Sequence, residues 1–475
     1  MRKLGWLALA LGASGFVLAP GCGSDDSSFP DGGPGSDATS PFGDSSSPFG
    51  DTGTGGDGKT CTGLCLKQVN CGGNATTSIT GTVYDPAGNL PLYNVAVYVP
   101  NAPLAPITHG ATCDQCGSTL SGDPLVATLT DTAGHFELDN VPVDNNIPLV
   151  IQVGKWRRRI TIPTVTACAE NPITDPALTR LATKPQETSP DDDIPYIALT
   201  TGGADALECL LPLVGIASDQ FTSTSSSGRV NLYKGNGGSQ LSGGSASATS
   251  FWADNGAANT NPLTAYDMVM LGCEGSTYPG EKPSSALQAM EAYANAGGRV
   301  FGTHYHYYWI ESNPSPSLWP TTATFQHGGD PQDPLTVTID QTFAKGQAFA
   351  QWMQNVGGST TLGTFKINEP RHDVTAVNSQ PPTDPVSIQW VYATNPAITE
   401  YYSFNTPVGT TSDKQCGKVV FSDLHVAAGD SVGGTFPNNC KNKTLTAQEK
   451  ALVFLLFDLS SCIQNDNQPP PPPVH

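Results

Sequence analysis

Histidines follow two apolar segments of the chain in a pattern that suits metal binding or proton transfer. His304 and His306 come directly after the apolar segment 299–303, and His425 closely follows a second one, 418–422. Neutral imidazoles bind Zn²⁺ and similar borderline cations, and they transfer protons near neutral pH. These three side chains are therefore the first candidates for a functional site.

The metal hypothesis takes these histidines together with one oxygen ligand. The candidate ligands are His304, His306 and His425, with Glu274 or Asp423 as the oxygen donor. Residues i and i+2 of an extended segment project to the same side, so His304 and His306 can share an ion. A divalent metal such as zinc would suit this set, and an open coordination position would activate water. His327 and His372 lie in loops that match no recognisable element and could add ligands.

Two alternatives need no metal. In one, His304 or His425 transfers a proton and is oriented by a carboxylate, so the candidate catalytic residues are His304, His425, Asp423 and Glu274. Cys273 would be a nucleophile only if a neighbouring histidine stabilised its thiolate. In the other, the aromatic residues 305–309 pack under a loop or stack on a sugar. Because the sequence contains no complete catalytic set, ligand binding without catalysis is the leading interpretation.

The elements that must position these residues alternate between strands and helices after a polar linker at 183–193. Strands are predicted at 194–200, 229–233, 266–273, 299–303 and 418–422, and helices at 204–211, 285–294 and 446–459. Thr446 and Glu449 have the spacing of a capping box. This alternation predicts a flavodoxin-like α/β domain with a doubly wound parallel sheet, in which ligands bind beyond the carboxyl ends of the strands. The candidate residues, together with Gly202-Gly203, all follow predicted strands.

An earlier region, 78–162, has the alternation of short β-strands. Strands are predicted at 80–84, 95–99, 125–130, 135–138 and 149–153, with turns at 85–88 and 131–134. This spacing indicates a small antiparallel β-sandwich. The basic run Lys155-Trp-Arg-Arg-Arg159 is interpreted as an edge strand with solvated cations.

Both regions resemble known families. The Thr130-Asp-Thr-Ala-Gly-His-Phe136 segment and its flanking strands, about residues 75–165, are similar to the carboxypeptidase-regulatory-like, transthyretin-like sandwich, which implies a non-catalytic module for spacing or binding. Leu271-Gly-Cys-Glu-Gly275 and Ala296-Gly-Gly-Arg-Val-Phe-Gly-Thr-His304 resemble the class I glutamine amidotransferase-like superfamily, and its ThuA-like branch above all. The glutaminase nucleophile would stand at His304, so the resemblance implies no glutaminase activity. ThuA-like proteins carry histidines that would match His304 and His425.

The two ends of the chain predict export and lipid anchoring. Residues 1–21 have the basic start, apolar core and small-residue end of a signal peptide, which makes Cys22 the expected lipidated residue. Residues 22–60 form a Gly/Ser/Asp-rich segment predicted to be a disordered tether, and 463–475 a Pro-rich tail. The predicted domains are the sandwich at 61–185 and the α/β domain at 190–462.

The charge and the cysteine content of the chain indicate which classes of partner it can bind and which cellular compartment it occupies. A formal net charge of −20 excludes nucleic acid as a partner and leaves the lipid anchor as the contact with a membrane. Twelve cysteines indicate an oxidising compartment, and with Cys22 lipidated an odd number remains. Cys273 is the best candidate for the unpaired one. Cys113 and Cys116 are expected in disulfides rather than in half of a zinc site, because no second pair follows at the required spacing.

The sequence therefore predicts an envelope lipoprotein, anchored in the outer membrane, whose ThuA-like domain binds a small molecule or a carbohydrate. A metal-assisted hydrolase or isomerase that uses the histidine site is the first alternative. A structural surface protein, with both domains acting as spacers, is the second.

Overall fold

The computed structural model describes residues 61–73, 75–224, 228–252, 261–378, 387–427, 429–441 and 443–473. The predicted signal peptide, Cys22 and the tether lie outside these ranges. All the described residues belong to one compact unit. In the part of the chain that the structure describes, no helix is long and apolar enough to cross a membrane.

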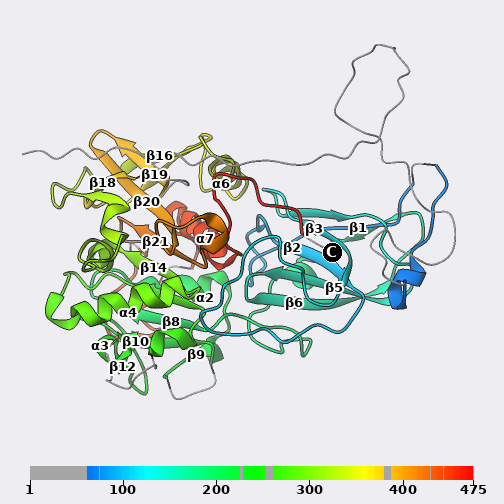
Figure 1. Cartoon of the computed structure of the whole chain (residues 1–475), viewed down its shortest axis with the longest axis horizontal. Helices are drawn as coiled ribbons and strands as arrows, with labels where there is room; N and C mark the ends of the chain where they lie inside the picture. Colours follow the sequence, from blue (N-terminus) through cyan, green and yellow to red (C-terminus); the bar gives the residue numbers. More distant parts are fainter. Residues whose placement is uncertain are drawn as a thin grey trace, which may run out of the picture. The chain divides into compact units, whose positions relative to one another are not determined.

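The first region forms two facing β-sheets (Figure 1). Its strands are β1 Ser78–Thr82, β2 Ala96–Pro100, β3 Pro124–Leu129, β4 His135–Leu138, β5 Asn145–Val153, β6 Trp156–Thr164 and β7 Glu170–Ile173. One sheet has the order β3-β2-β5-β6 and is antiparallel, and the other has the order β4-β1-β7. The predicted sandwich is thus present, but it is not purely antiparallel, because β1 and β7 pair in parallel.

The basic run belongs to β6, which is an edge strand as predicted, but two of its arginines are not solvated. Arg157 and Arg158 are each 4% exposed. The Arg157 side chain donates to the carbonyl oxygens of Ala105 and Asp191, and Arg158 lies 3.5 Å from the Glu187 carboxylate. The linker that follows the sandwich covers this strand and supplies acceptors, a tertiary effect that alternation along β6 cannot reveal.

The second region contains a long mixed sheet. Its parallel half comprises β8 Ile197–Thr201, β10 Val230–Lys234, β12 Ala246–Ser247, β13 Met268–Leu271, β14 Arg299–Thr303 and β21 Gly417–Ser422, with β9 Phe221–Thr222 beside β10. The central order β10-β8-β13-β14-β21 is the 2-1-3-4-5 order of flavodoxin-like folds. The predicted α/β class is therefore correct for this half of the sheet.

The segment between β14 and β21 extends the sheet in an unpredicted way. Its strands are β15 Ala323–Phe325, β16 Leu335–Ile339, β17 Thr364–Ile367, β18 Val374–Val377, β19 Ile388–Thr394 and β20 Ala397–Thr406. Four of them continue the sheet beyond β21 in the antiparallel order β20-β19-β16-β17, and β15 pairs with β18. A small separate pair joins β11 Gln240–Leu241 to β22 Thr435–Phe436. The sheet as a whole is mixed, not parallel.

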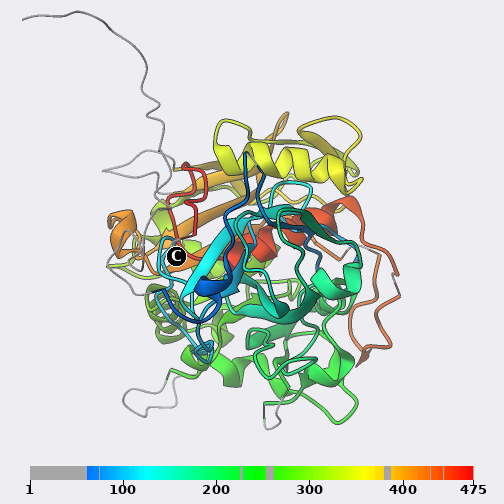
Figure 2. The ribbon, with the colours of Figure 1, turned by 90° about the vertical axis from the view of Figure 1, so that its right-hand side faces the viewer.

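Helices cover both faces of the parallel half (Figures 1 and 2). The α-helices are α1 Pro176–Thr179, α2 Leu210–Val214, α3 Ala248–Trp252, α4 Ser284–Asn295, α5 Tyr308–Glu311, α6 Ala344–Asn355 and α7 Ala447–Ser460. Alternate residues of β13 enter different cores: Met268 and Met270 join the core that contains α2, α6 and α7, and Val269 and Leu271 join the core of α3 and α4. This alternation is the pattern of a strand buried on both faces.

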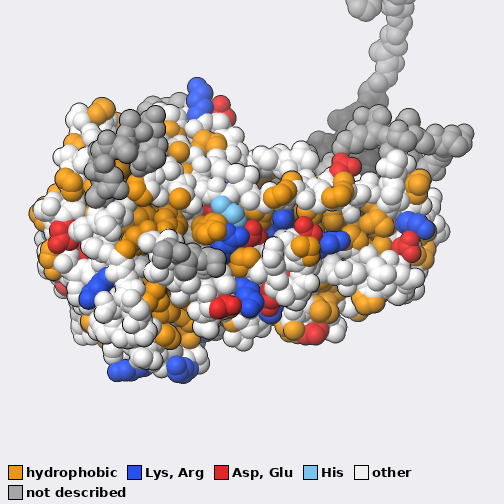
Figure 3. Space-filling model, turned by 90° about the horizontal axis from the view of Figure 1, so that it is seen from below, with side chains coloured by type: hydrophobic (Ala, Val, Ile, Leu, Met, Phe, Trp, Pro, Cys, Tyr) orange, Lys and Arg blue, Asp and Glu red, His pale blue; other side chains and the backbone are white. Residues whose placement is uncertain are grey.

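The sandwich and the α/β region share one of these cores. Sandwich residues such as Val97 and Ile151 belong to the same buried cluster as α7, and the Trp156 and Phe457 rings are 5.2 Å apart. Two disulfides, Cys113–Cys416 and Cys116–Cys462, join the sandwich loop, which is the loop between β2 and β3, to the α/β region. On the face in Figure 3, acidic and basic side chains are interspersed, so this face carries no broad basic surface for an anionic polymer.

Candidate functional site

The β14 strand ends in a sharp turn that places His304 at the carboxyl edge of the sheet. The residue begins a short 3-10 helix, His304–Tyr307, and has a φ of 42°. A positive φ is unfavourable for a histidine and persists only where the surroundings hold it, and such residues cluster at functional sites. Glu369, described below, has a φ of 50°. Two of the strained residues of the chain therefore lie at one place.

Cys273, His304 and His425 converge beyond the ends of β13, β14 and β21. The Nδ1 atom of His304 lies 3.4 Å from Cys273 Sγ and 3.1 Å from His425 Nε2. The three ligand atoms lie within 4.8 Å of one another, and all three residues are buried. Strands β13, β14 and β21 lie side by side in the sheet and run parallel, so residues far apart in sequence meet at their carboxyl ends.

Each imidazole presents its other nitrogen to a carboxylate. His425 Nδ1 lies 2.7 Å from Glu369 Oε2, and His304 Nε2 lies 3.2 Å from Asp373 Oδ2. Arg371 also approaches His425 Nδ1, at 3.2 Å, but the shorter contact to Glu369 assigns the ring proton to Nδ1. The two inner nitrogens, His304 Nδ1 and His425 Nε2, are then lone-pair acceptors that face each other and a sulfur atom.

Three acceptor atoms at this separation need protons or a cation between them. In the protein alone, protons take this place, and the pKa values reflect this. Burial lowers the pKa of His304, but hydrogen bonds with Asp373 and Cys273 outweigh it and raise the value to about 9. The pKa of His425 likewise reaches about 9, through Cys273 and Glu369. Burial raises the pKa of the Cys273 thiol, but the two histidines bring it down to about 7.

The same atoms fit a metal ion. Tetrahedral zinc with Zn–N bonds of about 2.0–2.1 Å and a Zn–S bond of about 2.3 Å separates two nitrogens by ~3.3 Å, and nitrogen from sulfur by ~3.6 Å. The observed 3.1 and 3.4 Å are each about 0.2 Å shorter. Carboxylates behind both imidazoles are the usual outer partners of metal-bound histidines. A thiolate and two imidazoles suit zinc or another borderline to soft cation.

His306, although predicted to share the ion, does not join this cluster. Its Nε2 contacts the Gly272 carbonyl oxygen at 2.9 Å, and its Nδ1 accepts a hydrogen bond from Trp309 Nε1. Burial lowers its pKa to about 4. The prediction assumed an extended segment, but 304–307 is helical, so residues i and i+2 diverge.

The two predicted carboxylates, Glu274 and Asp423, have other partners. Glu274 binds the buried Lys282 ammonium group at 2.6 Å and the backbone N–H of Asn236. Asp423 Oδ2 accepts the backbone N–H groups of Asp373 and Val374. Asp423 therefore holds the segment that brings Asp373 to His304, and it makes no hydrogen bond to any of the three clustered side chains.

The site carboxylates that were missed come from the region between β14 and β21. Glu369 and Asp373 lie in the charged run Asn-Glu-Pro-Arg-His-Asp at 368–373. Such a run is typical of a solvated loop, and only the antiparallel extension of the sheet brings it over the histidines. His327 meets Asp373 Oδ1 at 2.7 Å, next to the site, whereas His372 contacts the Gly328 carbonyl oxygen.

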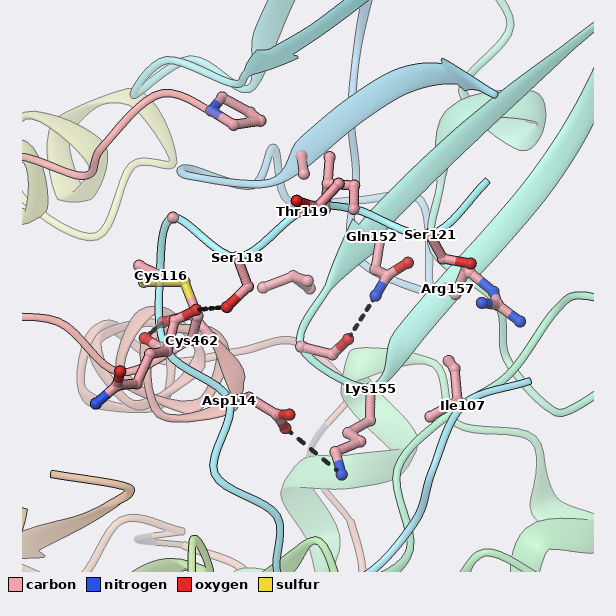
Figure 4. A pocket seen from close by; sticks show the side chains of 18 of the residues that line it. Ile107, Asp114, Cys116, Ser118, Thr119, Ser121, Gln152, Lys155, Arg157 and Cys462 are labelled. Atoms are coloured by element: carbon pink, nitrogen blue, oxygen red, sulfur yellow. Dashed lines mark hydrogen bonds and ion pairs between the residues drawn. A yellow bond between two sulfur atoms is a disulfide. The ribbon is translucent and has the colours of Figure 1, made fainter. Parts of the chain in front are cut away.

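A large cleft lies elsewhere, beside the sandwich (Figure 4). It has a volume of about 500 Å³ and is lined by the 105–121 loop, the start of β6 and the C-terminal segment. Its charged groups bind its own walls: Lys155 lies 3.5 Å from Asp114 and donates to the Thr108 carbonyl oxygen. The cleft contains none of the clustered thiol and imidazole groups, so it does not replace the site at the sheet edge.

Comparisons with known proteins give weak structural likenesses. No family model and no curated protein matches this chain. A putative ThuA-like protein from Bacteroides uniformis matches at 11% identity and a TM-score of 0.26, covering 48% of this chain and 82% of that one. A type II cohesin-X-dockerin complex from Acetivibrio cellulolyticus matches at 16% identity and a TM-score of 0.15, covering 32% and 78%. At these TM-scores the likenesses carry no argument about fold or function, and the assignment to a flavodoxin-like sheet rests on the strand order described above.

Proposed function

We propose that Cys273, His304 and His425 bind one divalent metal ion, with zinc as the best fit, and that the α/β domain acts on a small molecule there. The observation that carries the proposal is the orientation of the two imidazoles. Both turn one nitrogen toward Cys273 and the other toward a carboxylate. A bound metal would act as a Lewis acid and activate water, which supports a hydrolase or isomerase.

The surroundings of the thiol support this proposal. Cys273 is the one free cysteine among the described residues, and the other ten form five disulfides. In an oxidising compartment an unpaired thiol survives best when it is buried or metal-bound. Cys273 is 0% exposed, while Glu369 and His327 beside the site keep more than a third of their side chains exposed. Solvent therefore reaches the outer carboxylate and imidazole that border the buried cluster.

The first experiment is elemental analysis of the purified, disulfide-bonded protein. We expect one metal ion per chain in the wild type, and none in the His304→Ala, His425→Ala or Cys273→Ser variants. His135→Ala is the control, because His135 is exposed on β4 and far from the cluster in sequence and sheet. A wild-type protein that takes up no zinc after reconstitution would overturn the metal centre.

A second candidate is a cysteine nucleophile. The observation that favours it is the same Cys273–His304 contact together with the thiol pKa of about 7, which makes a substantial thiolate fraction at neutral pH. The two candidates differ in one result. Iodoacetamide should label Cys273 in the metal-free protein under both, but only the metal centre predicts that added zinc blocks the labelling.

We further propose that the ligand is a small polyhydroxylated molecule such as a sugar. The Tyr305 ring lies 4.0 Å from the His304 ring, centroid to centroid, and is half-buried. An aromatic face beside a site of this kind can stack on the apolar face of a sugar ring. Tyr305→Ala should weaken saturation-transfer signals from monosaccharides screened by NMR while metal content stays the same. Equal signals from both proteins would contradict a sugar at this site.

For the chain as a whole we propose a lipoprotein of the bacterial outer membrane, lipidated at Cys22, with a carboxypeptidase-regulatory-like sandwich as the spacer below a ThuA-like domain. The signal-like start and the five disulfides support export to an oxidising compartment. Metabolic labelling with a fatty-acid analogue should mark the wild type and not Cys22→Ser. Label retained in the variant would contradict the anchor.

A further inference from the structure

A buried carboxylate, Asp205, lies directly after β8 and binds the loop that carries His425. Its Oδ2 accepts the Val426 N–H at 2.9 Å, and its Oδ1 accepts the Ala427 N–H at 3.0 Å. The residue is 1% exposed. Two hydrogen bonds to consecutive amides fix the backbone that follows His425, and hence the position of the imidazole.

The same residue contacts the loop that carries Cys273. The Asp205 N–H donates to the Cys273 carbonyl oxygen at 3.2 Å, next to a 2.9 Å bond from Ala204. The approach is close: a Cβ on Gly202 would lie 2.0 Å from that carbonyl oxygen. Gly202, the first residue of the Gly-Gly pair that follows β8, therefore allows the β8 turn to pack against the cysteine, whereas Gly203 approaches the Asn236 backbone.

A second side chain connects the Cys273 loop to the strand that ends in His304. Thr303, the residue before His304, directs its hydroxyl group at the Leu271 carbonyl oxygen of β13, 3.5 Å away. The Thr303 oxygen also accepts the Cys273 N–H at 2.9 Å. Asp205 and Thr303 together thus connect the backbones of all three loops.

We propose that Asp205 is a positioning residue of the metal centre: it holds the His425 loop against the Cys273 loop at the spacing that a single cation requires, while Thr303 links the His304 turn to the Cys273 loop. This inference rests on the proposed metal centre. A carboxylate is needed because it offers two acceptor oxygens, one for each amide of 426 and 427. An asparagine would direct an N–H₂ group at one of those amides and would leave it without an acceptor.

Asp205→Asn and Glu208→Gln form a matched pair for the test. Both change a buried carboxylate to the isosteric amide within the same turn, but the Glu208 side chain accepts a hydrogen bond from Asn439 and makes none to the backbones next to Cys273, His304 or His425. Each protein is stripped of metal, and Co²⁺ is then titrated in competition with a chelator while its visible spectrum is recorded. The spectrum reports ligand geometry, which a general loss of stability would not change.

We expect Asp205→Asn to weaken Co²⁺ binding by about 10- to 100-fold and to alter the spectrum, since outer partners of metal ligands have effects of that size. Glu208→Gln should match the wild type in both. Thr303→Val, which removes one link of the network, should show a smaller change in the same direction and carries the test if Asp205→Asn does not fold. Wild-type affinity and spectrum in Asp205→Asn, or in Thr303→Val where it stands in, would overturn this inference alone; a wild type that binds no Co²⁺ or Zn²⁺ overturns the metal centre and the inference together.

Discussion

Single residues decide which histidines can take part in chemistry. His304 and His425 each keep one nitrogen in the cluster with the Cys273 sulfur, whereas both nitrogens of His306 are bound to structural partners. The pKa values follow this division, being raised for His304 and His425 by acidic partners and lowered for His306 by burial. A histidine count along the sequence cannot make this distinction, because it depends on what lies opposite each ring.

His306→Gln tests the division directly. We expect the metal content of this variant to equal that of the wild type, because His306 supplies no ligand. Its stability should fall by about 1–3 kcal/mol, since the buried Trp309 N–H and Gly272 carbonyl oxygen lose their partner. Elemental analysis and urea denaturation measure the two effects. Loss of the metal at unchanged stability would show that the ligand set described above is wrong.

Glu208 provides a test of pH dependence away from the metal ligands. Burial raises its pKa from 4.5 to about 7, although hydrogen bonds from Ser239 and Asn439 lower it. The folded protein therefore retains a proton that the unfolded chain releases above about pH 4.5. The contribution of Glu208 to the free energy of unfolding is fully present below that pH. It is lost as the pH rises through 7, and the total loss is up to about 3 kcal/mol.

Glu208→Gln should remove that loss. The variant keeps an acceptor for Asn439 and has no proton to release, so its stability relative to the wild type should be higher at pH 8 than at pH 5. Denaturant unfolding of both proteins at the two pH values isolates the contribution of this one group, because the other titrating groups are common to both. A difference that does not change with pH would contradict the raised pKa.

Secondary-structure elements were predictable where the pattern is local. Strands β1 to β6 of the sandwich, the central strands β8, β10, β13, β14 and β21, and helices α4 and α7 all lie within a few residues of their predicted positions, whereas β7 was not predicted. Hydrophobic alternation and helix caps depend on residues a few positions apart, so they can be recognised directly in the sequence. The predicted helix at 204–211 is the exception: it begins late, as a 3-10 turn at 207, because Gly202 to Asp205 pack against the Cys273 loop.

The antiparallel extension could not be predicted in the same way. Strands β16, β17, β19 and β20 are paired by long-range register, and the sequence between 310 and 400 carries no motif for it. This limit also applies to the site. His304 and His425, which follow predicted strands, were found from the sequence, whereas the carboxylates that orient them, which lie in the unpredicted region, were not. The free thiol was predicted from the odd number of cysteines and from the place of Cys273 at the end of an apolar strand, but the sequence did not show that a histidine lies beside it.

Helix α7 offers a prediction at the scale of elements. Thr446 accepts the Glu449 N–H, and the Glu449 side chain accepts the Thr446 N–H, which confirms the predicted capping box. Thr446→Ala should lower the free energy of unfolding by about 1 kcal/mol, as the loss of an N-cap does. Thr444→Ala, just before the helix, is the matched control. Equal unfolding midpoints for wild type and Thr446→Ala would mean that the buried faces of α7 fix its start without the cap.

The whole molecule is fastened at its C-terminal end by charges buried together. Lys345 and Lys418 each bind both Asp458 and Asp466, at distances between 2.6 and 2.9 Å. Two positive and two negative groups balance, which is the condition under which buried charges are tolerated. Asp466 belongs to the segment after α7, so the beginning of the predicted Pro-rich tail is anchored to the α/β region.

Two disulfides act on the same scale. Cys113–Cys416 and Cys116–Cys462 span 303 and 346 residues, and both join the sandwich loop to the α/β region. Either bond alone closes a large ring of more than 300 residues, because Cys113 and Cys116 are only three residues apart. Removing one opens only the small ring that runs through 113–116 and 416–462. Removing both bonds also opens the large ring, and opening a larger ring increases the conformational entropy of the unfolded chain by more.

The double loss should therefore exceed the sum of the single losses. The chain-entropy relation gives about 4 kcal/mol for the small ring and somewhat under 6 kcal/mol for the large one, as upper values. Cysteine-to-alanine changes at 113 and 416, at 116 and 462, and at all four positions complete a cycle that denaturant unfolding can measure. An excess of about 1–2 kcal/mol in the fourfold variant is expected. Strict additivity would mean that the packing of Trp156 against Phe457 and its neighbours already keeps the two regions together in the unfolded ensemble, so that the disulfides restrict each other's ring very little.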